Sequence, residues 1–162
     1  MVRKVPQAIL ANAIAVIIDT NTWLDWLLFN DGCTQLLKAQ FREQRIYILA
    51  TPEMRSELNE VLERPHIGLQ FIGRSEFDSV GAIMAEFDKI VTLITAPLAN
   101  KLLPQCKDGD DQIFIDAAFS SKAILITKDR LVLGLARQLK QRFNTVVMKP
   151  HQAGDYIFNL AR

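Results

Sequence analysis

The sequence contains few of the residues that build zinc sites, disulfide frameworks or histidine-based active sites. Its 162 residues include two cysteines, Cys33 and Cys106, and two histidines, His66 and His151. The cysteines lie too far apart in the chain to form a metal-ligand pair, and we expect small buried or idle thiols in a reducing compartment. Neither histidine has a serine or cysteine partner at an informative spacing, so we expect both in loops. The sequence therefore offers no convincing zinc site and no sign of a nucleophilic triad.

Net charge and long apolar runs are also missing. Lysine and arginine together number 19, and aspartate and glutamate 18, so the net charge is +1. Attraction to a nucleic acid would therefore have to come from local clusters of positive charge. No run approaches the roughly 18 apolar residues that span a bilayer, and the apolar run before residues 11–13 is too short for a secretory signal. We therefore expect a cytoplasmic protein that does not associate with membranes.

Short apolar runs alternate with amphipathic segments along a chain that is 49% apolar and of single-domain size. We expect strands at residues 13–18, 46–50, 90–94, 123–126 and 145–148. We expect helices at about residues 22–29, 34–42, 51–63, 75–88, 111–120, 131–140 and 151–160. Thr51 is the expected N-cap of the third helix, and Ser75 begins a capping-box-like start of the fourth. The alternation predicts parallel βαβ units in a three-layer α/β domain, with the site outside the carboxyl ends of the strands.

Acidic residues stand at those strand ends. The first strand is followed by Asp19 and the fourth by Asp129. Asp111 and Glu57 lie on the apolar stripes of their expected helices, which is unusual unless a cation meets them. Four carboxylates in one place raise each other's pKa and oppose folding. A hard divalent cation such as Mg²⁺ relieves this repulsion and supports phosphodiester hydrolysis.

Each acid also has a simpler interpretation when it is taken alone. Asp19 and Asp129 could cap helices, Asp111 could be part of an acidic first turn, and Glu57 could be a solvated helix residue. A further acid, Asp116, lies about 140° round the helix from Asp111, and we expect it to be structural. Asp108 and Asp110 could approach a metal through their loop, although we favour this less. The joint pattern of four acids carries more weight than any one of them.

The ordered segments that contain these acids resemble the PIN-domain ribonucleases. The segments are Asp-Thr-Asn at 19–21, the helix segment at 55–65, the acidic start of the helix at 111–118, and the strand end at 124–131. The similarity extends from about residue 13 to 157 and is closest to the toxin components of toxin–antitoxin pairs. It implies a three-layer α/β/α PIN-like domain at 13–162 whose central, mainly parallel sheet has four to five strands. Residues 1–12 would be an amino-terminal extension, because the family's first strand usually begins almost at the initiator methionine.

The resemblance also implies residue roles. Asp19, Glu57, Asp111 and Asp129 would be the catalytic quartet that holds Mg²⁺ or Mn²⁺. Asn21 would orient Asp19, and Thr127 would be a hydroxyl partner close to the same cluster. The implied activity is endoribonuclease cleavage of single-stranded RNA, with an antitoxin protein as partner and a homodimer as the assembly.

Basic residues near the acids are candidates for binding the RNA backbone. We expect Lys128, Arg130 and Arg55 to contact substrate, because each lies close to one of the acids in the sequence. Arg137, Lys140 and Arg142 extend this cluster, although an ordinary solvated helix face would look the same.

Trp23 and Trp26, three residues apart, most simply pack in the core. The other interpretation is an exposed stripe that docks a second copy or an antitoxin helix. The two arrangements differ in whether the rings are buried.

Three other functions have to be weighed against a ribonuclease toxin. A stand-alone RNA-processing nuclease would use the same residues. A non-catalytic RNA-binding or protein-binding module of the same fold would be free to lose some of the four acids, all of which are present. A phosphatase of the haloacid-dehalogenase type requires a second aspartate two residues after Asp19, where this chain has Asn21.

Overall fold

Five parallel strands form the centre of the molecule in the computed structural model, which describes residues 12–71 and 75–160. They are β1 (Ile14–Ile18), β2 (Ile46–Ala50), β3 (Val91–Leu93), β4 (Ile124–Ile126) and β5 (Val147–Met148). Their order across the sheet is β3-β2-β1-β4-β5, and Val16 at the centre is aligned with Ile48 on one side and Ile124 on the other. The central strands are almost wholly apolar and buried, as expected for a parallel sheet covered on both faces.

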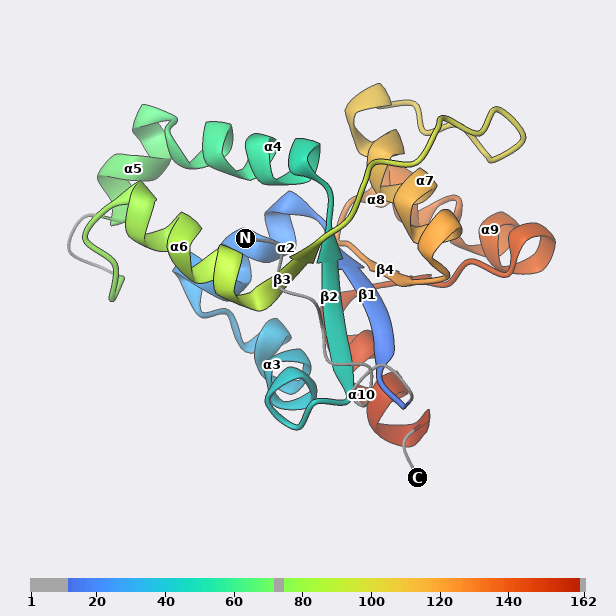
Figure 1. The fold of residues 1–162 in the computed structure, drawn as a ribbon, viewed down its shortest axis with the longest axis horizontal. Coiled ribbons are helices and arrows are strands. Elements are labelled where there is room, and N and C mark those ends of the chain that lie inside the picture. Colours follow the sequence, from blue (N-terminus) through green and yellow to red (C-terminus); the bar gives the residue numbers. More distant parts are fainter. Residues whose placement is uncertain (1–11, 72–74, 161–162) are drawn as a thin grey trace.

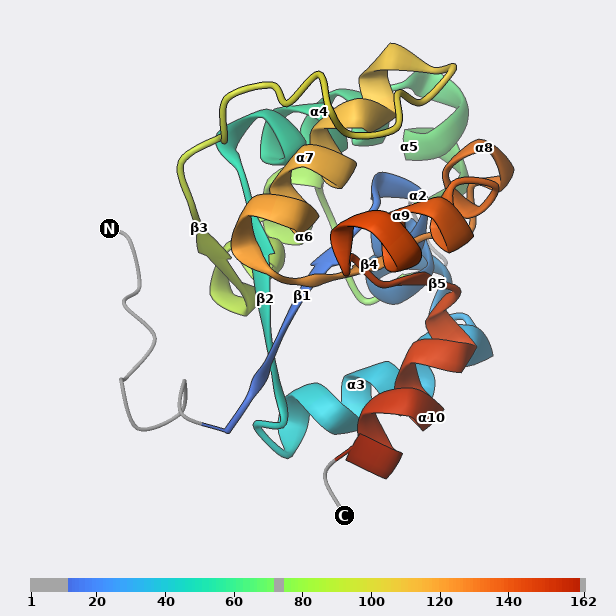
Figure 2. The ribbon, with the colours of Figure 1, turned by 90° about the vertical axis from the view of Figure 1, so that its right-hand side faces the viewer.

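Helices cover both faces of this sheet, so the predicted three-layer α/β/α architecture is confirmed. The helices that precede β4 are α2 (Thr20–Leu24), η1 (Asp25–Phe29, a π-helix), η2 (Gly32–Thr34, a 3₁₀ turn), α3 (Gln35–Arg42), α4 (Pro52–Leu62), α5 (Pro65–Phe71), α6 (Val80–Ile90), η3 (Gly109–Asp111, a 3₁₀ turn) and α7 (Gln112–Ser121). After β4 come α8 (Arg130–Leu133), α9 (Ala136–Phe143) and α10 (Pro150–Leu160). Figure 1 shows α2 to α6 on one side of the sheet and α7 to α9 on the other, and α10 packs against α3 (Figure 2).

Several predictions about helices need correction. His66 and His151 were expected in loops, but they lie in α5 and α10. The fourth helix begins at Val80, because Ser79 caps it by accepting a hydrogen bond from Ala82 N at 3.1 Å. Ser75, the expected start, instead makes a local turn in which its hydroxyl accepts from the Phe77 amide. The helix expected at 131–140 is interrupted near Gly134 and forms α8 and α9. The Arg64-Pro65 pair separates two helices, since the proline occupies the first position of α5.

The two tryptophans belong to the core. Trp23 and Trp26 are 3% and 8% exposed, and their ring centroids lie 5.6 Å apart. Trp23 also packs edge-on against Phe87 of α6, and Trp26 against Phe41 of α3. The alternative of an exposed tryptophan stripe for docking a partner is therefore wrong.

The strand order fixes where a site can form. The chain moves outward from β1 to β2 and β3, and then crosses back to β4 on the other side of β1. Such a reversal leaves a crevice at the carboxyl ends of the two central strands. The ends of β1 and β4 meet there, with Asp19 N donating to the Ile126 carbonyl at 3.0 Å.

Two expectations from the sequence concern features at the margins of this fold. The extension predicted at residues 1–12 lies, except for Asn12, outside the described residues. Within the described part of the chain, no helix combines the length and the apolar character that a membrane crossing requires.

Candidate active site

The carboxyl edge of β1 and β4 is built around Asp19 and Thr127. Asp19 follows β1 directly and caps α2, with its Oδ1 accepting from Thr22 N at 2.8 Å. Thr127 follows β4, and its hydroxyl donates to Asp19 Oδ2 at 2.5 Å. The same hydroxyl oxygen accepts from the Asp129 amide at 2.9 Å. One buried threonine therefore fixes the first acid and the loop that carries the fourth.

Asp19 is held in surroundings that disfavour its charge. Its side chain is 6% exposed, and burial raises the pKa of this carboxyl, while hydrogen bonds from Thr127 and Thr22 act in the opposite direction. A carboxylate buried in this way is stabilised most by a positive charge placed beside it.

Glu57 reaches the same edge from α4. The Thr20 hydroxyl, at the start of α2, donates to Glu57 Oε1 at 2.8 Å. Burial raises the pKa of Glu57, and the nearby charges of Asp110 and Asp19 raise it further, against the lowering effect of the Thr20 hydrogen bond. The alternative of a fully solvated helix residue therefore does not describe Glu57. Thr20 was not singled out in the sequence, because its partner lies 37 residues away and only the packing of α2 on α4 brings the two together.

Asp111 stands at the start of α7 without capping it. Its side chain accepts no capping hydrogen bond, whereas Asp108 caps the preceding 3₁₀ turn through Asp110 N. Burial raises the pKa of Asp111 to about 6, and the negative charges of Asp129, Asp108, Asp19 and Glu57 contribute to the rise. The other three members of the predicted quartet thus all lie within electrostatic range of Asp111.

Asp129 caps a helix and also lies close to the other acids. It is the N-cap of α8, because its Oδ1 accepts from Leu131 N at 2.7 Å and from Val132 N at 3.1 Å. It also lies on the acidic edge, as its effect on the pKa of Asp111 shows. Its Oδ2 takes part in no hydrogen bond among the described residues.

Ion pairs of the described residues do not include the four carboxylates. In the described ranges 12–71 and 75–160, none of the four is in an ion pair with lysine or arginine. Lys128, which directly precedes Asp129, instead pairs with Asp25 of η1. Arg55 donates two hydrogen bonds of 2.7 Å to Asp88 of α6. The edge therefore carries net negative charge that the protein leaves uncompensated.

The carboxylate oxygens of the four acids suit a hard divalent cation, although they do not form a preformed metal cage. Among the described residues, no three histidine, cysteine, aspartate or glutamate side chains are arranged to enclose a metal ion. Hydrogen bonds tie Asp19 to Thr127 after β4, Glu57 to Thr20 of α2, and Asp129 to the α8 backbone. Mg²⁺ needs only one or two carboxylates and keeps several waters. Carboxylate oxygens without imidazole or thiolate suit Mg²⁺ or Mn²⁺ rather than Zn²⁺.

The structure separates the remaining predicted residues into two groups. Asn21, Lys128 and Arg130 line an open groove together with Asp129. The hydrogen bonds to Asp19 come from Thr22 and Thr127, so the structure gives no contact by which Asn21 would orient that acid. Arg55 lies two residues before Glu57 on α4, and residues with this spacing do not face each other on a helix.

Asp116 has the structural role expected of it. It is 8% exposed and accepts a hydrogen bond from Gln112 Nε2 at 3.1 Å. Gln112 Oε1 in turn accepts from Cys106 N at 2.7 Å. The pair therefore braces the loop that leads into α7, which positions Asp111.

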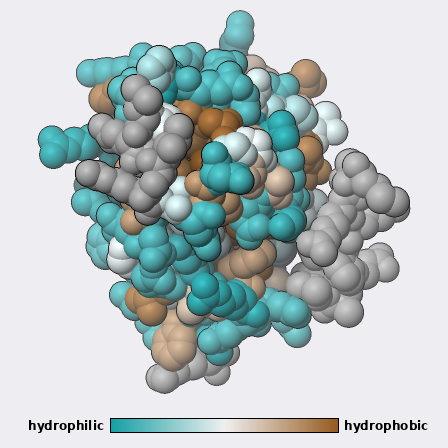
Figure 3. Space-filling model, turned by 90° about the vertical axis from the view of Figure 1, so that its left-hand side faces the viewer, coloured by the Kyte–Doolittle hydropathy of each residue, from teal (hydrophilic) through white to brown (hydrophobic). Residues whose placement is uncertain are grey.

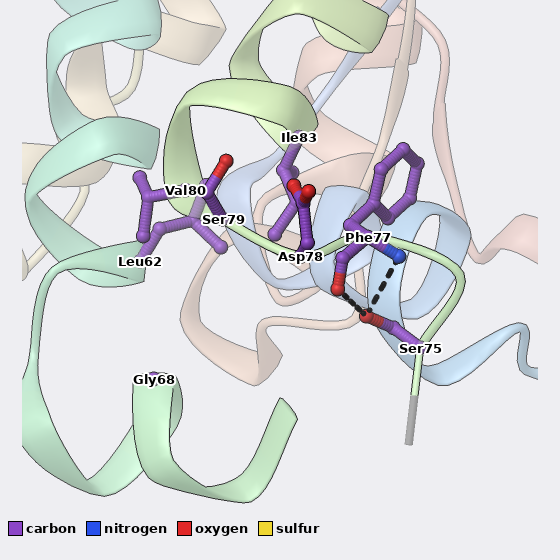
Figure 4. Close-up of a pocket in the computed structure, with 8 residues that line it drawn as sticks. All are labelled: Leu62, Gly68, Ser75, Phe77, Asp78, Ser79, Val80 and Ile83. Atoms are coloured by element: carbon purple, nitrogen blue, oxygen red, sulfur yellow. Dashed lines mark hydrogen bonds between the residues drawn. The ribbon is translucent and has the colours of Figure 1, made fainter. Parts of the chain in front are cut away.

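An apolar hollow between the end of α4, α5 and the start of α6 is separate from this edge. Leu62, Phe77, Val80 and Ile83 are among the residues that line it (Figure 4). Figure 3 faces this side of the molecule and shows an apolar area near the top of a mostly hydrophilic surface. None of the four acids lines this hollow.

Comparison with known proteins identifies the fold family. A protein of Methanocaldococcus jannaschii, described as uncharacterized protein MJ1680, is 26% identical over 145 residues, which cover 89% of this chain and 90% of that protein. A model of the PIN domain matches residues 15–131, a range that contains Asp19, Glu57, Asp111 and Asp129. Members of this family are generally nucleases that use divalent metals. The chain therefore belongs to the PIN domain family, whose fold is of the nuclease type.

Proposed function

We propose that this protein is an endoribonuclease that uses Mg²⁺ or Mn²⁺ to hydrolyse phosphodiester bonds of single-stranded RNA. One observation carries this function, namely the gathering of Asp19, Glu57, Asp111 and Asp129 at one sheet edge, where no lysine or arginine of the described residues pairs with them. A binding module with no chemistry would have no need to retain such an unfavourable cluster. Membership of the PIN domain family supports the same reaction class.

The four acids would hold the cation from fixed positions. Asp19 is the rigid member, because Thr127 and the α2 backbone fix both of its oxygens. Among the described residues, one oxygen each of Asp129 and Glu57 takes part in no hydrogen bond and would be open to a cation. A bound divalent cation would neutralise charge on the phosphate and activate water for its hydrolysis. Without a cation, burial and the neighbouring acids raise the pKa of the Asp111 carboxyl to about 6, and a cation bound beside it would favour its charged form.

Substrate binding is assigned to the basic side of the groove. Lys128 and Arg130 line it beside Asp129, so they can meet the phosphates on either side of the bond that is cut. Arg55 is left out of this path, because Asp88 binds its guanidinium on another face of α4. Backbone contacts of this kind give binding with little sequence preference.

The test is cleavage of a labelled single-stranded RNA by the purified protein. We expect cleavage with Mg²⁺ or Mn²⁺, none after EDTA, and none from Asp19→Asn with divalent metal present. Asp155→Asn, which alters an exposed acid on α10, is the matched control and should cleave as the wild type does. Equal cleavage by Asp19→Asn and wild type would show a contaminating nuclease and overturn the function.

The biological role that we propose is the toxin of a toxin–antitoxin pair, with an antitoxin protein as partner and a homodimer as the assembly. The resemblance of residues 13–157 to toxin components supports this role. Expression of the wild type should stop growth of a bacterial host, and expression of Asp19→Asn should not. Growth that is unaffected by an active wild-type enzyme would favour a stand-alone RNA-processing nuclease instead.

A further inference from the structure

An open groove beside the acidic edge carries an aromatic ring as well as positive charge. Asn21, Phe29, Lys128, Asp129 and Arg130 line it. Because Asp129 belongs to the predicted quartet and also lines this groove, a phosphate held at the quartet would lie beside the groove. Whatever is attached to that phosphate would then lie along the groove.

Phe29 is presented to this groove by an unusual turn of helix. In a regular α-helix, residues three apart share a face, so Phe29 would lie beside the buried Trp26. Residues Asp25–Phe29 instead form a π-helix, which has wider turns and occurs frequently at functional sites. Phe29 is 51% exposed, whereas Trp26 is 8% exposed. The wide turn thus keeps one ring in the core and brings the other to the groove.

The positive charge continues beyond the first groove. Lys128 is held against the groove wall by its ion pair with Asp25, which is 5% exposed. Arg130 is exposed and, within residues 12–71 and 75–160, forms no ion pair. A second open groove is lined by Lys128, Arg130 and Lys149, so the two hollows adjoin at Lys128 and Arg130. Basic side chains therefore line a path from Asp129 to the start of α10.

We propose that this groove binds the nucleotide next to the cleaved phosphodiester, with its base stacked on Phe29 and the next phosphates alongside Arg130 and Lys149. This binding mode deepens the ribonuclease function proposed above and rests on it. Every nucleobase has a π-face, so stacking on a ring tolerates any sequence. The exposed Asn21 amide in the same lining offers one donor and one acceptor to a base edge.

The stacking is tested by binding of a short labelled single-stranded oligoribonucleotide to protein that carries Asp19→Asn and therefore should not cut it. Added Phe29→Ala or Phe29→Leu should weaken binding roughly 5- to 150-fold, because each removes the aromatic face. Added Phe29→Tyr should bind as Phe29 does. Binding that is equal for the leucine and tyrosine variants would overturn the stacking, since both fill the space and only one has a ring.

The phosphate path is tested by the salt dependence of the same binding. Each lost phosphate contact lowers the steepness of log K against log salt by about 0.7 for a single strand. We expect this change for Arg130→Gln and for Lys149→Gln. Lys122→Gln is the control, because this exposed lysine follows α7 and precedes β4, at the opposite edge of the sheet. Unchanged slopes for Arg130→Gln and Lys149→Gln would overturn the path.

Failure of this binding mode is distinguishable from failure of the ribonuclease function. If the wild type cleaves RNA while Phe29→Leu binds as Phe29→Tyr does, only the groove assignment is wrong. If Asp19→Asn protein binds no single-stranded RNA and the wild type cleaves none, the ribonuclease function fails and the groove assignment fails with it. Circular dichroism of each variant verifies that the fold is retained.

Discussion

At the scale of single residues, the site depends on one hydroxyl group. Thr127 is 1% exposed, donates to Asp19 and accepts from the Asp129 amide. Valine has nearly the same shape as threonine, but it lacks the hydroxyl and so can make neither of these two hydrogen bonds. We expect Thr127→Val to lower the free energy of unfolding by about 1–3 kcal/mol, because buried polar groups lose their partner. The same variant should reduce RNA cleavage, and urea unfolding with a cleavage assay measures both effects.

Thr145→Val is the matched control for this variant. Thr145 is also buried, at 4% exposed, but its hydroxyl makes only a local 3.3 Å hydrogen bond to the Phe143 carbonyl. Its loss should be smaller and should leave cleavage unchanged. Similar losses of cleavage in both variants would mean that Thr127 acts through general stability and not through Asp19.

The raised pKa of Asp111 gives a pH dependence with a definite sign. The pKa is about 6 in the folded protein and 3.8 in an unperturbed carboxyl. Between about pH 4 and pH 6 the folded state therefore holds a proton that the unfolded state has released, so this group makes the protein less stable as pH rises through that window. Without divalent metal, Asp111→Asn should raise the melting temperature at pH 7 and have little effect near pH 4. A larger gain at pH 4 than at pH 7 would contradict the assignment.

The sequence identified the acids of the site, but not the side chains that hold them. Asp19 and Asp129 follow apolar strands, and this position is visible in any single sequence. The partners of Glu57 and Lys128, which are Thr20 and Asp25, lie far away in the chain and become neighbours only through the packing of α2 and η1. The spacing of residues along the sequence cannot predict such long-range contacts. The same reason explains why Arg55 was predicted to face the substrate although Asp88 of α6 binds it.

At the scale of elements, two glycines in helices should respond in opposite ways to replacement by alanine. A Cβ at Gly154 of α10 would lie 2.5 Å from Leu36 Cβ on α3, whereas a Cβ at Gly81 of α6 meets nothing closer than 3.9 Å. We expect Gly154→Ala to destabilise by about 1–3 kcal/mol, because the two helices must move apart. Gly81→Ala should stabilise by about 0.4–1 kcal/mol, because it restricts the unfolded chain. Thermal melts of both variants measure these changes in stability. A Gly154→Ala variant as stable as the wild type would contradict the close α3–α10 contact.

Strands and helices differed in how well the sequence predicted them. Buried strands are recognisable as short, continuous apolar runs, and β2 has the predicted bounds of 46–50. The segment at 22–29 was expected to be one α-helix, because apolar spacing cannot distinguish an α-turn from the wider π-turn of η1. The sequence did not predict α5, which begins at Pro65, because a proline can follow the end of one helix and also occupy the first turn of the next. The errors therefore lie where one residue type is compatible with two backbone arrangements.

At the scale of the whole molecule, a net charge of +1 conceals an uneven distribution. Two basic side chains close to the quartet in the sequence are paired with other acids, Arg55 with Asp88 and Lys128 with Asp25. At the edge the charged forms of Asp111 and Glu57 are disfavoured, because burial and then nearby acids raise both pKa values. The thiol of Cys106 is affected as well, since burial and then the charges of Asp111 and Asp129 raise its pKa. Repulsion within the folded protein is therefore concentrated at one edge.

This distribution predicts that divalent metal stabilises the fold through the quartet. Ligand at about 100 times its Kd adds about 2.7 kcal/mol of stability, which for a domain of this size is roughly 5–10 °C in Tm. We expect Mg²⁺ or Mn²⁺ to give such a shift in the wild type and in Asp155→Asn, but a much smaller one in Asp19→Asn. Sodium chloride at equal ionic strength should not reproduce it, because screening acts weakly on partly buried charges. An equal shift in Asp19→Asn, or with sodium chloride alone, would mean that the stabilising ion binds elsewhere or only screens surface charge.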